Sequence, residues 1–373
     1  MLFRSTQESL LLSPYAVLGN QARAQTRRRA LGAVSVGWAG GVLLAIVTLL
    51  VTAGVLAWIG EVEQQAWTRL LLALAVAGPG VLVHGLARRV AYAHLSVASA
   101  LRLDVAVGLG QVLAVVGLWA ADALSAETAL LSLGAAGAAG GVVWWWRHRR
   151  WACWDRRAVR PWLRRSWRFG RWILGSQQVR AVSGLLVTTV LAAMAGAEEA
   201  GRYAAAALVV VAANPLLLGL GGVMEPKAAA AWASGGAAEL RRVVRKVTGF
   251  VAAVLACYVA LAAVIGEALL DWVFADPAYQ GLGHAIAVLA AAMFVRGVRI
   301  GWNNAIKAMR KPAWNLIAGV TELVVLAGLI VPLTIDSGLI GAAYAILLAS
   351  GVGSAVRAYA YLRIVPVTRP PLA

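Results

Sequence analysis

The amino-acid sequence predicts an all-α polytopic membrane protein built from two pseudo-symmetric helix bundles. The first observation is composition: the 373 residues are 61% hydrophobic and only 13% charged, whereas soluble domains carry about 25% charged residues. The second is length: about ten mostly apolar stretches reach the ~20 residues that a helix needs to cross a bilayer. The third is an internal repeat, which predicts that the helices form two related sets.

The repeat joins two patterns of five residues that lie 211 positions apart in similar apolar surroundings. A second correspondence, at an offset of 212, pairs Pro14 with Pro226, and each proline is followed by a basic run. Paired halves in an apolar chain indicate a transporter whose working site lies between the repeats. The first pattern is Arg88, Asp104, Gly108, Gln111 and Gly117, and the second is Arg299, Asn315, Gly319, Glu322 and Gly328.

Hydropathy and length place the expected membrane-spanning helices along the whole chain. The apolar tract Leu10–Leu18 is too short to span, and we interpret it as the last part of an eleventh helix. When 211 is subtracted from the residue numbers of the second set of helices, its first helix falls before Met1. The first set is therefore expected to lack its first helix, and the complete fold from which this chain derives is expected to have twelve or more helices. The ten spans are 34–58, 70–87, 101–120, 128–146, 172–195, 203–223, 247–270, 284–302, 313–333 and 338–361.

This pattern divides the chain into three parts. Residues 1–146 are expected to form an N-terminal bundle that lacks its first helix, and 172–373 a C-terminal bundle of six helices. Between them, 147–171 is a basic linker rich in tryptophan and arginine. Such a composition is typical of a segment anchored at the membrane surface, and arginines at that level meet anionic lipids. The linker is therefore interpreted as a surface anchor, with attraction of a lipid-linked phosphate substrate as the alternative.

The distribution of charge predicts the orientation of the chain. The net charge is +18, and about 30 of the 34 Lys and Arg residues fall in alternate loops, on one side of the predicted membrane. This bias marks the cytoplasmic side. The sequence therefore predicts a multi-pass protein of the bacterial inner membrane with a cytoplasmic C-terminus, and the basic charge is assigned to topology and lipid contact, not to nucleic acid.

The sequence offers no basis for catalysis or for a cofactor. The two cysteines, Cys153 and Cys257, are expected in a loop and inside a helix, so they do not form a disulfide framework. Neither they nor the four histidines show metal-ligand spacing. There is no Gly-rich phosphate loop followed by Lys-Ser or Lys-Thr, so ATP hydrolysis by this chain is not expected.

Polar residues inside the predicted helices are the candidate substrate site, because charges within a membrane usually face a cavity or a partner. Arg180 lies nine residues into helix 172–195, about 13 Å from its cytoplasmic end. Ser176, Gln177 and Ser183 share its helix face. Arg180 is expected to bind an anionic substrate group.

Glu322 lies at a similar depth, and its repeat counterpart is Gln111. It is expected to carry a proton or to balance Arg180; a purely structural Arg180–Glu322 pair is the alternative. Three further residues complete the candidate cavity: Arg4, on one face with Glu8, and Arg299 and Asn303, near the cytoplasmic end of helix 284–302. For these three, a role in setting topology is the competing interpretation. Asn214-Pro215 is expected to interrupt helix 203–223, because proline removes a helix hydrogen bond.

Several short motifs follow one another along the chain. They are Leu10-Leu-Leu-Ser-Pro14-Tyr-Ala-Val-Leu-Gly19, Gly170-Arg-Trp-Ile-Leu-Gly-Ser176, Gly201-Arg-Tyr-Ala-Ala, Asn214-Pro-Leu, Met224-Glu-Pro226-Lys and Lys307-Ala-Met-Arg-Lys-Pro312. In the order and spacing of these motifs, the chain resembles the polysaccharide (O-antigen and exopolysaccharide) flippases of the multidrug/oligosaccharidyl-lipid/polysaccharide (MOP) exporter superfamily, without the first helix and part of the second. The resemblance covers nearly the whole chain.

The resemblance implies two bundles around a central cavity that is often cationic, and movement of an undecaprenyl-diphosphate-linked glycan between leaflets by alternating access. Polysaccharide polymerase and glycosyltransferases are the implied protein partners, beside membrane lipids. Arg180 suits the diphosphate because a guanidinium matches phosphate geometry. Two alternatives stay open: a cation-coupled exporter of small molecules, of the multidrug and toxin extrusion (MATE) type, and a scaffold in polysaccharide assembly that does not transport.

Overall fold

The computed structural model describes residues 2–59, 62–274 and 277–365, and all the regular secondary structure in these ranges is helical. Seven of the helices in the described ranges are long and apolar enough to cross a membrane. The predicted fold class, a polytopic all-α membrane protein, is confirmed. The chain divides into two compact units, residues 1–170 and 171–373, each described here by itself.

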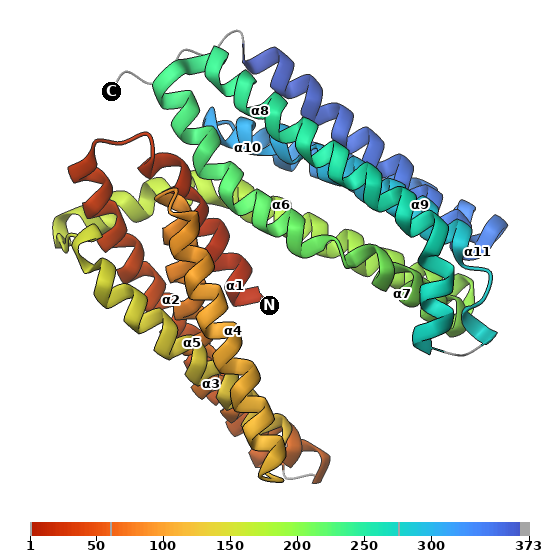
Figure 1. The fold of residues 1–373 in the computed structure, drawn as a ribbon, viewed down its shortest axis with the longest axis horizontal. Coiled ribbons are helices and arrows are strands. Elements are labelled where there is room, and N and C mark those ends of the chain that lie inside the picture. Colours follow the sequence, from red (N-terminus) through yellow and green to blue (C-terminus); the bar gives the residue numbers. More distant parts are fainter. Residues whose placement is uncertain (1, 60–61, 275–276, 366–373) are drawn as a thin grey trace. The chain divides into compact units, whose positions relative to one another are not determined.

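In the first unit, the chain begins with an irregular helix, α1 (Leu2–Gln7), which continues as the π-helical turns Glu8–Leu12 and Tyr15–Gly19 on either side of Pro14. Because proline has no N–H group, it disturbs the regular hydrogen-bond ladder at this point. The following helices are α2 (Ala24–Ile59), α3 (Val62–Ala93), α4 (Val97–Ala120), α5 (Ala126–His148) and the 3₁₀ turn Arg149–Trp151 (Figure 1).

Helix α6 (Arg156–Met194) begins in the first unit and ends in the second. It includes the second half of the segment expected as a linker, so 156–171 is continuous with the expected span 172–195. Its arginines have good helix propensity, and no residue near position 171 breaks the ladder. Within this segment Pro161 lies in the second turn, where a missing N–H is tolerated more readily than in a helix interior.

Among its described residues, the second unit contains five further helices, two of which bend sharply. Gly236 in α8 and Gly338 in α11 have positive φ angles, of 57° and 53°, and each marks a kink between two helical halves. Glycine tolerates this backbone region because it has no Cβ atom. The elements are α7 (Gly196–Val211), α8 (Asn214–Phe274), α9 (Gly283–Val298), α10 (Ile300–Ala308), α11 (Ala313–Ile364) and the 3₁₀ turn Pro277–Tyr279.

Two expectations about the connections need correction. The segment 224–246 separates the expected spans 203–223 and 247–270 and would therefore be a basic loop, but it is helical within α8 apart from the kink at Gly236. Its alanine-rich sequence has high helix propensity, which hydropathy does not measure. Likewise 196–202, the gap between the expected spans 172–195 and 203–223, is the first part of α7. The expected interruption at Asn214-Pro215 is confirmed, because α7 ends at Val211 and α8 starts at Asn214.

Small residues let α3 and α5 lie side by side in the first unit (Figure 1). A Cβ atom on Gly80 would lie 2.0 Å from the carbonyl oxygen of Gly134, and one on Gly134 would lie 2.4 Å from the Cα of Ala77. No larger side chain fits such a contact, and this is how small residues bring transmembrane helices together. The glycines at 134–141 therefore serve packing.

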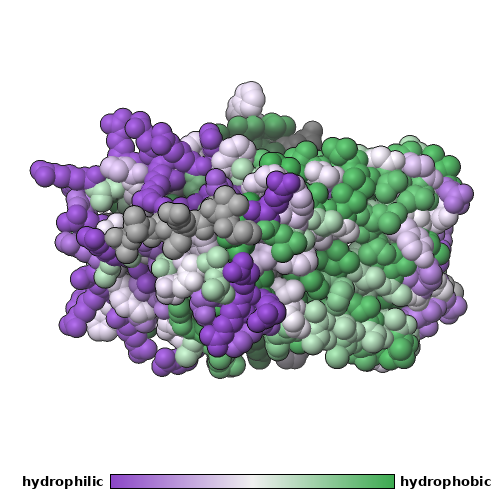
Figure 2. Space-filling model, turned by 90° about the horizontal axis from the view of Figure 1, so that it is seen from above, coloured by the Kyte–Doolittle hydropathy of each residue, from purple (hydrophilic) through white to green (hydrophobic). Residues whose placement is uncertain are grey.

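Much of the surface is apolar. Large hydrophobic side chains are exposed on α2, α4, α8 and α11, among them Leu43, Leu113, Val264 and Val324. Figure 2 shows hydrophobic residues, in green, over a wide area of the face that it presents. Exposed patches of this extent are uncommon in soluble proteins and mark surfaces that contact lipid or other proteins. They agree with helices that lie in a bilayer.

Candidate functional site: a buried glutamate among three arginines

Glu322 is a buried acid in the second unit, 8% exposed, on the first half of α11. It lies nine residues after Ala313, the start of the helix, and thus about 14 Å along the axis. A carboxylate at this depth needs compensating charge or hydrogen bonds, because an ion loses hydration when it is buried.

Three arginines surround this carboxylate. Its Oε2 atom accepts hydrogen bonds from Nη1 of Arg299 at 2.7 Å and from Nη1 of Arg357 at 3.3 Å. Its Oε1 atom lies 3.7 Å from Nε of Arg296. Arg296 and Arg299 come from the end of α9 and the turn that follows it, whereas Arg357 comes from the second half of α11. The cluster therefore ties the end of α9 to both halves of the kinked helix α11.

Neighbouring groups hold the arginines in place. Arg357 also donates to the carbonyl oxygen of Gly353 at 2.8 Å, and Nε of Arg296 donates to Oγ of Ser350 at 2.8 Å. Gly353 and Ser350 lie on the same helical half as Arg357. Side chains fixed in this way lose little further entropy when they bind an anion, so the cluster is preorganised.

The cluster carries more positive than negative charge. Three guanidinium groups face one carboxylate, which leaves a formal charge of +2. The side chains of Arg299 and Arg357 are only 13% and 8% exposed, whereas that of Arg296 is 42% exposed. Arg299 and Arg357 are thus engaged by Glu322, and Arg296 retains a surface that an anionic ligand can reach.

Arg180 lies on α6, in the same unit, with an exposed side chain. It is close enough to Arg357 for their positive charges to interact. It adds to the positive charge of this region, and the hydrogen bonds described for Glu322 come from Arg299 and Arg357.

The other candidate residues lie in different places. Gln177 is half-buried on α6, and Asn303 is half-buried on α10, where its carbonyl oxygen accepts a hydrogen bond of 3.0 Å from Asn315. Gln111 is half-buried on α4, in the first unit. The side chain of Arg4 lies outside the described residues.

Sequence reasoning missed Arg357. It lies near the cytoplasmic end of the expected span 338–361, where an arginine is normally assigned to topology. One signal was present: Gly353, one helical turn before Arg357, leaves room for Glu322, since a Cβ atom there would lie 2.9 Å from the Cβ of Glu322. A small residue one turn from a charge in an apolar helix is a sign of close polar packing.

The first unit has a related but different arrangement. Arg88, the repeat counterpart of Arg299, lies with its Nη1 atom 3.7 Å from Oδ2 of Asp104. Oδ1 of Asp104 is 2.9 Å from Nε2 of His84. Asp104 lies seven residues before Gln111, the counterpart of Glu322, and therefore on the same helix face. Both units thus pair the repeated arginine with an acid on a later helix, Asp104 on α4 and Glu322 on α11. Within the repeat, the two acids lie seven residues, or about two helical turns, apart.

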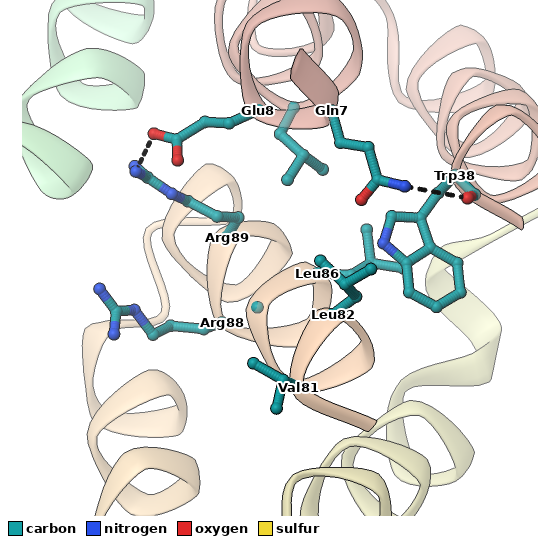
Figure 3. A pocket seen from close by; sticks show the side chains of 10 residues that line it. Gln7, Glu8, Trp38, Val81, Leu82, Leu86, Arg88 and Arg89 are labelled. Atoms are coloured by element: carbon teal, nitrogen blue, oxygen red, sulfur yellow. Dashed lines mark hydrogen bonds and ion pairs between the residues drawn. The ribbon is translucent and has the colours of Figure 1, made fainter. Parts of the chain in front are cut away.

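A small cleft in the first unit lies between the N-terminal helix, α2 and α3 (Figure 3). The side chains of Glu8 and Arg89 point toward each other and form an ion pair. Nε2 of Gln7 donates to the carbonyl oxygen of Trp38 at 3.3 Å. Glu8 lines this cleft, together with Arg88 and Arg89.

No protein-family model and no curated protein matches this chain. Solved structures do match it over almost its entire length. The MATE transporter VcmN of Vibrio cholerae, in a mutant form, is 15% identical, with a TM-score of 0.89 over 99% of this chain and 86% of that one. An outward-facing multidrug resistance MATE family transporter of the MOP superfamily is 12% identical, with a TM-score of 0.82 over 99% and 86%.

A third structure is a MOP superfamily transporter from Pyrococcus furiosus, 11% identical, with a TM-score of 0.80 over 98% of this chain and 85% of that one. Reverse polarity of its binding pocket was taken to suggest a different function for that protein. At these identities the similarity establishes architecture. The chain has the fold of the MATE transporters of the MOP superfamily.

Proposed function

We propose that this chain is a membrane transporter that works by alternating access and exports small amphipathic molecules, as a multidrug-type exporter. The observation that carries the proposal is the match to MATE transporters over 97–99% of the chain. The apolar surface and the division into two compact units support it, since alternating access needs two bodies that can rock against each other.

Ethidium accumulation tests this proposal. The full chain is expressed in bacterial cells that lack their own efflux pumps, and intracellular ethidium fluorescence is followed. Cells with the chain are expected to accumulate less ethidium than cells with an empty vector. Equal accumulation, with the chain present in the membrane, would contradict export of this class of molecule.

A pair of variants on one helix tests whether the arginine cluster takes part. Arg357→Gln removes a charge that contacts Glu322, and Arg363→Gln removes an exposed charge on the same helical half. Arg357→Gln is expected to abolish most of the efflux, whereas Arg363→Gln retains it. Equal efflux by both variants, at equal amounts in the membrane, would show that the cluster is not part of the transport path.

A second candidate function is movement of a lipid-linked oligosaccharide across the bacterial inner membrane, with the C-terminus in the cytoplasm and polysaccharide polymerase and glycosyltransferases as partners. The net positive charge around Glu322 favours it, together with the exposed side chains of Arg296 and Arg180. A diphosphate headgroup cannot cross hydrocarbon without compensating donors, and guanidinium groups supply them.

Proteoliposomes distinguish the two functions. A fluorescent polyprenyl-diphosphate sugar is incorporated, and dithionite added outside bleaches the probe that has reached the outer leaflet. A flippase would accelerate complete bleaching, and Arg296→Gln would slow it while Arg245→Gln, which also removes one exposed charge of this unit, would not. Bleaching no faster than in empty liposomes excludes the second function, and the absence of both activities would leave the scaffold alternative.

A further inference from the structure

The N-terminal part of α6 presents a row of four arginines: Arg157, Arg160, Arg164 and Arg168. Their spacing of three or four residues places them on one helix face. All four side chains are exposed, and the row is about 17 Å long at 1.5 Å per residue. We propose that this arginine row binds the phosphate headgroups of anionic phospholipids at the membrane surface.

The opposite face of the same helix is buried, and this burial keeps the arginine row at the surface. Trp162, Ser166 and Phe169 are 7%, 1% and 7% exposed. Gly170 packs so closely that a Cβ atom on it would lie 2.5 Å from the carbonyl oxygen of Ser9, and Leu163 contacts Gly37. The helix is therefore held against the first unit by one face, and the arginines are left on the other.

The arginine row is not neutralised within the part of the chain that the structure describes. None of its four guanidinium groups lies within 4.0 Å of a described carboxylate; the nearby Asp155 pairs with Arg29, at 3.4 Å. Two more exposed arginines, Arg156 and Arg165, flank the row. A line of uncompensated guanidinium groups attracts anions, and the planar fork of each donates to two phosphate oxygens at once.

Tryptophan points to membrane lipid as the source of the phosphate. Trp167, 54% exposed, lies beside Arg164 and Arg168, and Trp154, 66% exposed, lies just before α6. Tryptophan concentrates at the headgroup level of bilayers. The helix then continues without a break into a stretch with exposed apolar side chains such as Leu185. Along α6, the arginine row thus lies next to exposed tryptophans and precedes a stretch with exposed apolar side chains. This order is the one expected for a helix whose arginines lie at the level of the phosphate headgroups.

The test measures which lipids the full chain retains. Protein in detergent is equilibrated with equal amounts of phosphatidylglycerol and phosphatidylethanolamine, repurified, and its bound lipids are counted by mass spectrometry. Wild-type protein is expected to be enriched in phosphatidylglycerol. The variant with glutamine at all four row positions (R157Q, R160Q, R164Q, R168Q) is expected to lose this enrichment by about threefold or more, since each basic residue near the surface adds to the attraction.

The matched control removes four exposed basic residues from α8 (R241Q, R242Q, R245Q, K246Q), so that both variants lose the same charge. It is expected to keep the enrichment. Equal retention of phosphatidylglycerol by the row variant and the wild type, or an equal loss in the control, would overturn the proposal. So would complete displacement of the lipid by inorganic phosphate, which would assign the row to the free ion.

A charge-preserving variant covers the case in which the glutamine variant fails to fold. Lysine at all four positions keeps the charge but loses the bidentate geometry. It is expected to retain most of the enrichment, and the enrichment should fall as salt is added. Enrichment that is unaffected by salt would contradict an electrostatic row. These outcomes do not depend on what the chain transports.

Discussion

Gly353 lies directly against Glu322: a Cβ atom on this glycine would lie 2.7 Å from the Oε2 atom of the carboxylate and 3.1 Å from Nη1 of Arg357. The absence of a side chain at position 353 is thus what allows the glutamate on one half of α11 to reach the arginine on the other half. Gly353 thus lies where the two halves of α11 meet, next to both the buried acid and one of the arginines that surround it.

Gly353→Ala is therefore expected to destabilise the protein by about 1–3 kcal/mol, the usual cost of forcing a methyl group into a packed interior. The matched control is Gly351→Ala on the same helix, where an added Cβ atom meets nothing within 4 Å. Unfolding in detergent, followed by tryptophan fluorescence, measures both. Similar midpoints for the two variants would show that the contact relaxes without cost.

Glu322→Gln leaves Arg299 and Arg357 buried without their counter-charge. Breaking a buried pair by removing one partner costs about 3–5 kcal/mol, so a large fall in the free energy of unfolding is expected. Glu239→Gln serves as the control, because its pair with Arg242 is exposed and 3.5 Å long, and such pairs contribute about 0–1 kcal/mol. If the two variants unfold alike, the cluster does not hold the second unit together.

The close approach of α3 and α5 gives a third prediction. Gly80→Ala places a Cβ atom 2.0 Å from the carbonyl oxygen of Gly134 and is expected to push the two helices apart, with a loss of about 1–3 kcal/mol. Gly78→Ala, on the same helix, meets nothing within 4 Å. Because alanine has higher helix propensity than glycine, the control is expected to be neutral or slightly stabilising. A stabilising effect of both substitutions would refute the tight contact.

His94, in the turn between α3 and α4, makes the stability of the first unit depend on pH. Its Nε2 atom is 2.8 Å from the hydroxyl of Tyr15, and its ring stacks on Trp151 at 4.1 Å. Burial, followed by the charges of Arg27 and His148, lowers the pKa of His94 from 6.5 to about 3. Because the unfolded chain binds the proton more readily, this histidine contributes stability above pH 6.5 that is lost progressively as the pH falls toward 3.

The wild type is therefore expected to lose thermal stability between pH 7 and pH 5 more steeply than His94→Gln, which cannot become charged. The control, His284→Gln, removes an exposed histidine that also contacts a tyrosine, Tyr344, at 3.1 Å. Its melting curve is expected to follow that of the wild type at each pH. Parallel pH profiles for the wild type and His94→Gln would mean that other groups set the acid sensitivity.

The sequence alone determined the class of this protein, because hydropathy and span length are local properties that a bilayer selects directly. It also placed Glu322 and Arg299 inside a repeated polar pattern, since a charged residue within an apolar stretch can be recognised from the linear sequence without any knowledge of the fold. It did not determine helix continuity: hydropathy reports transfer to lipid, so the helical segments 224–235 and 156–171 were read as connections.

Only the tertiary structure decided which charges meet. Arg357 follows Glu322 by 35 residues, and it reaches the carboxylate because the kink at Gly338 folds α11 back on itself and Gly353 leaves space at the contact. Arg180 is prominent in the sequence, whereas the hydrogen bonds to Glu322 described above come from Arg299 and Arg357. Pairing among buried charges depends on distances of a few ångströms between segments far apart along the chain, which only packing sets.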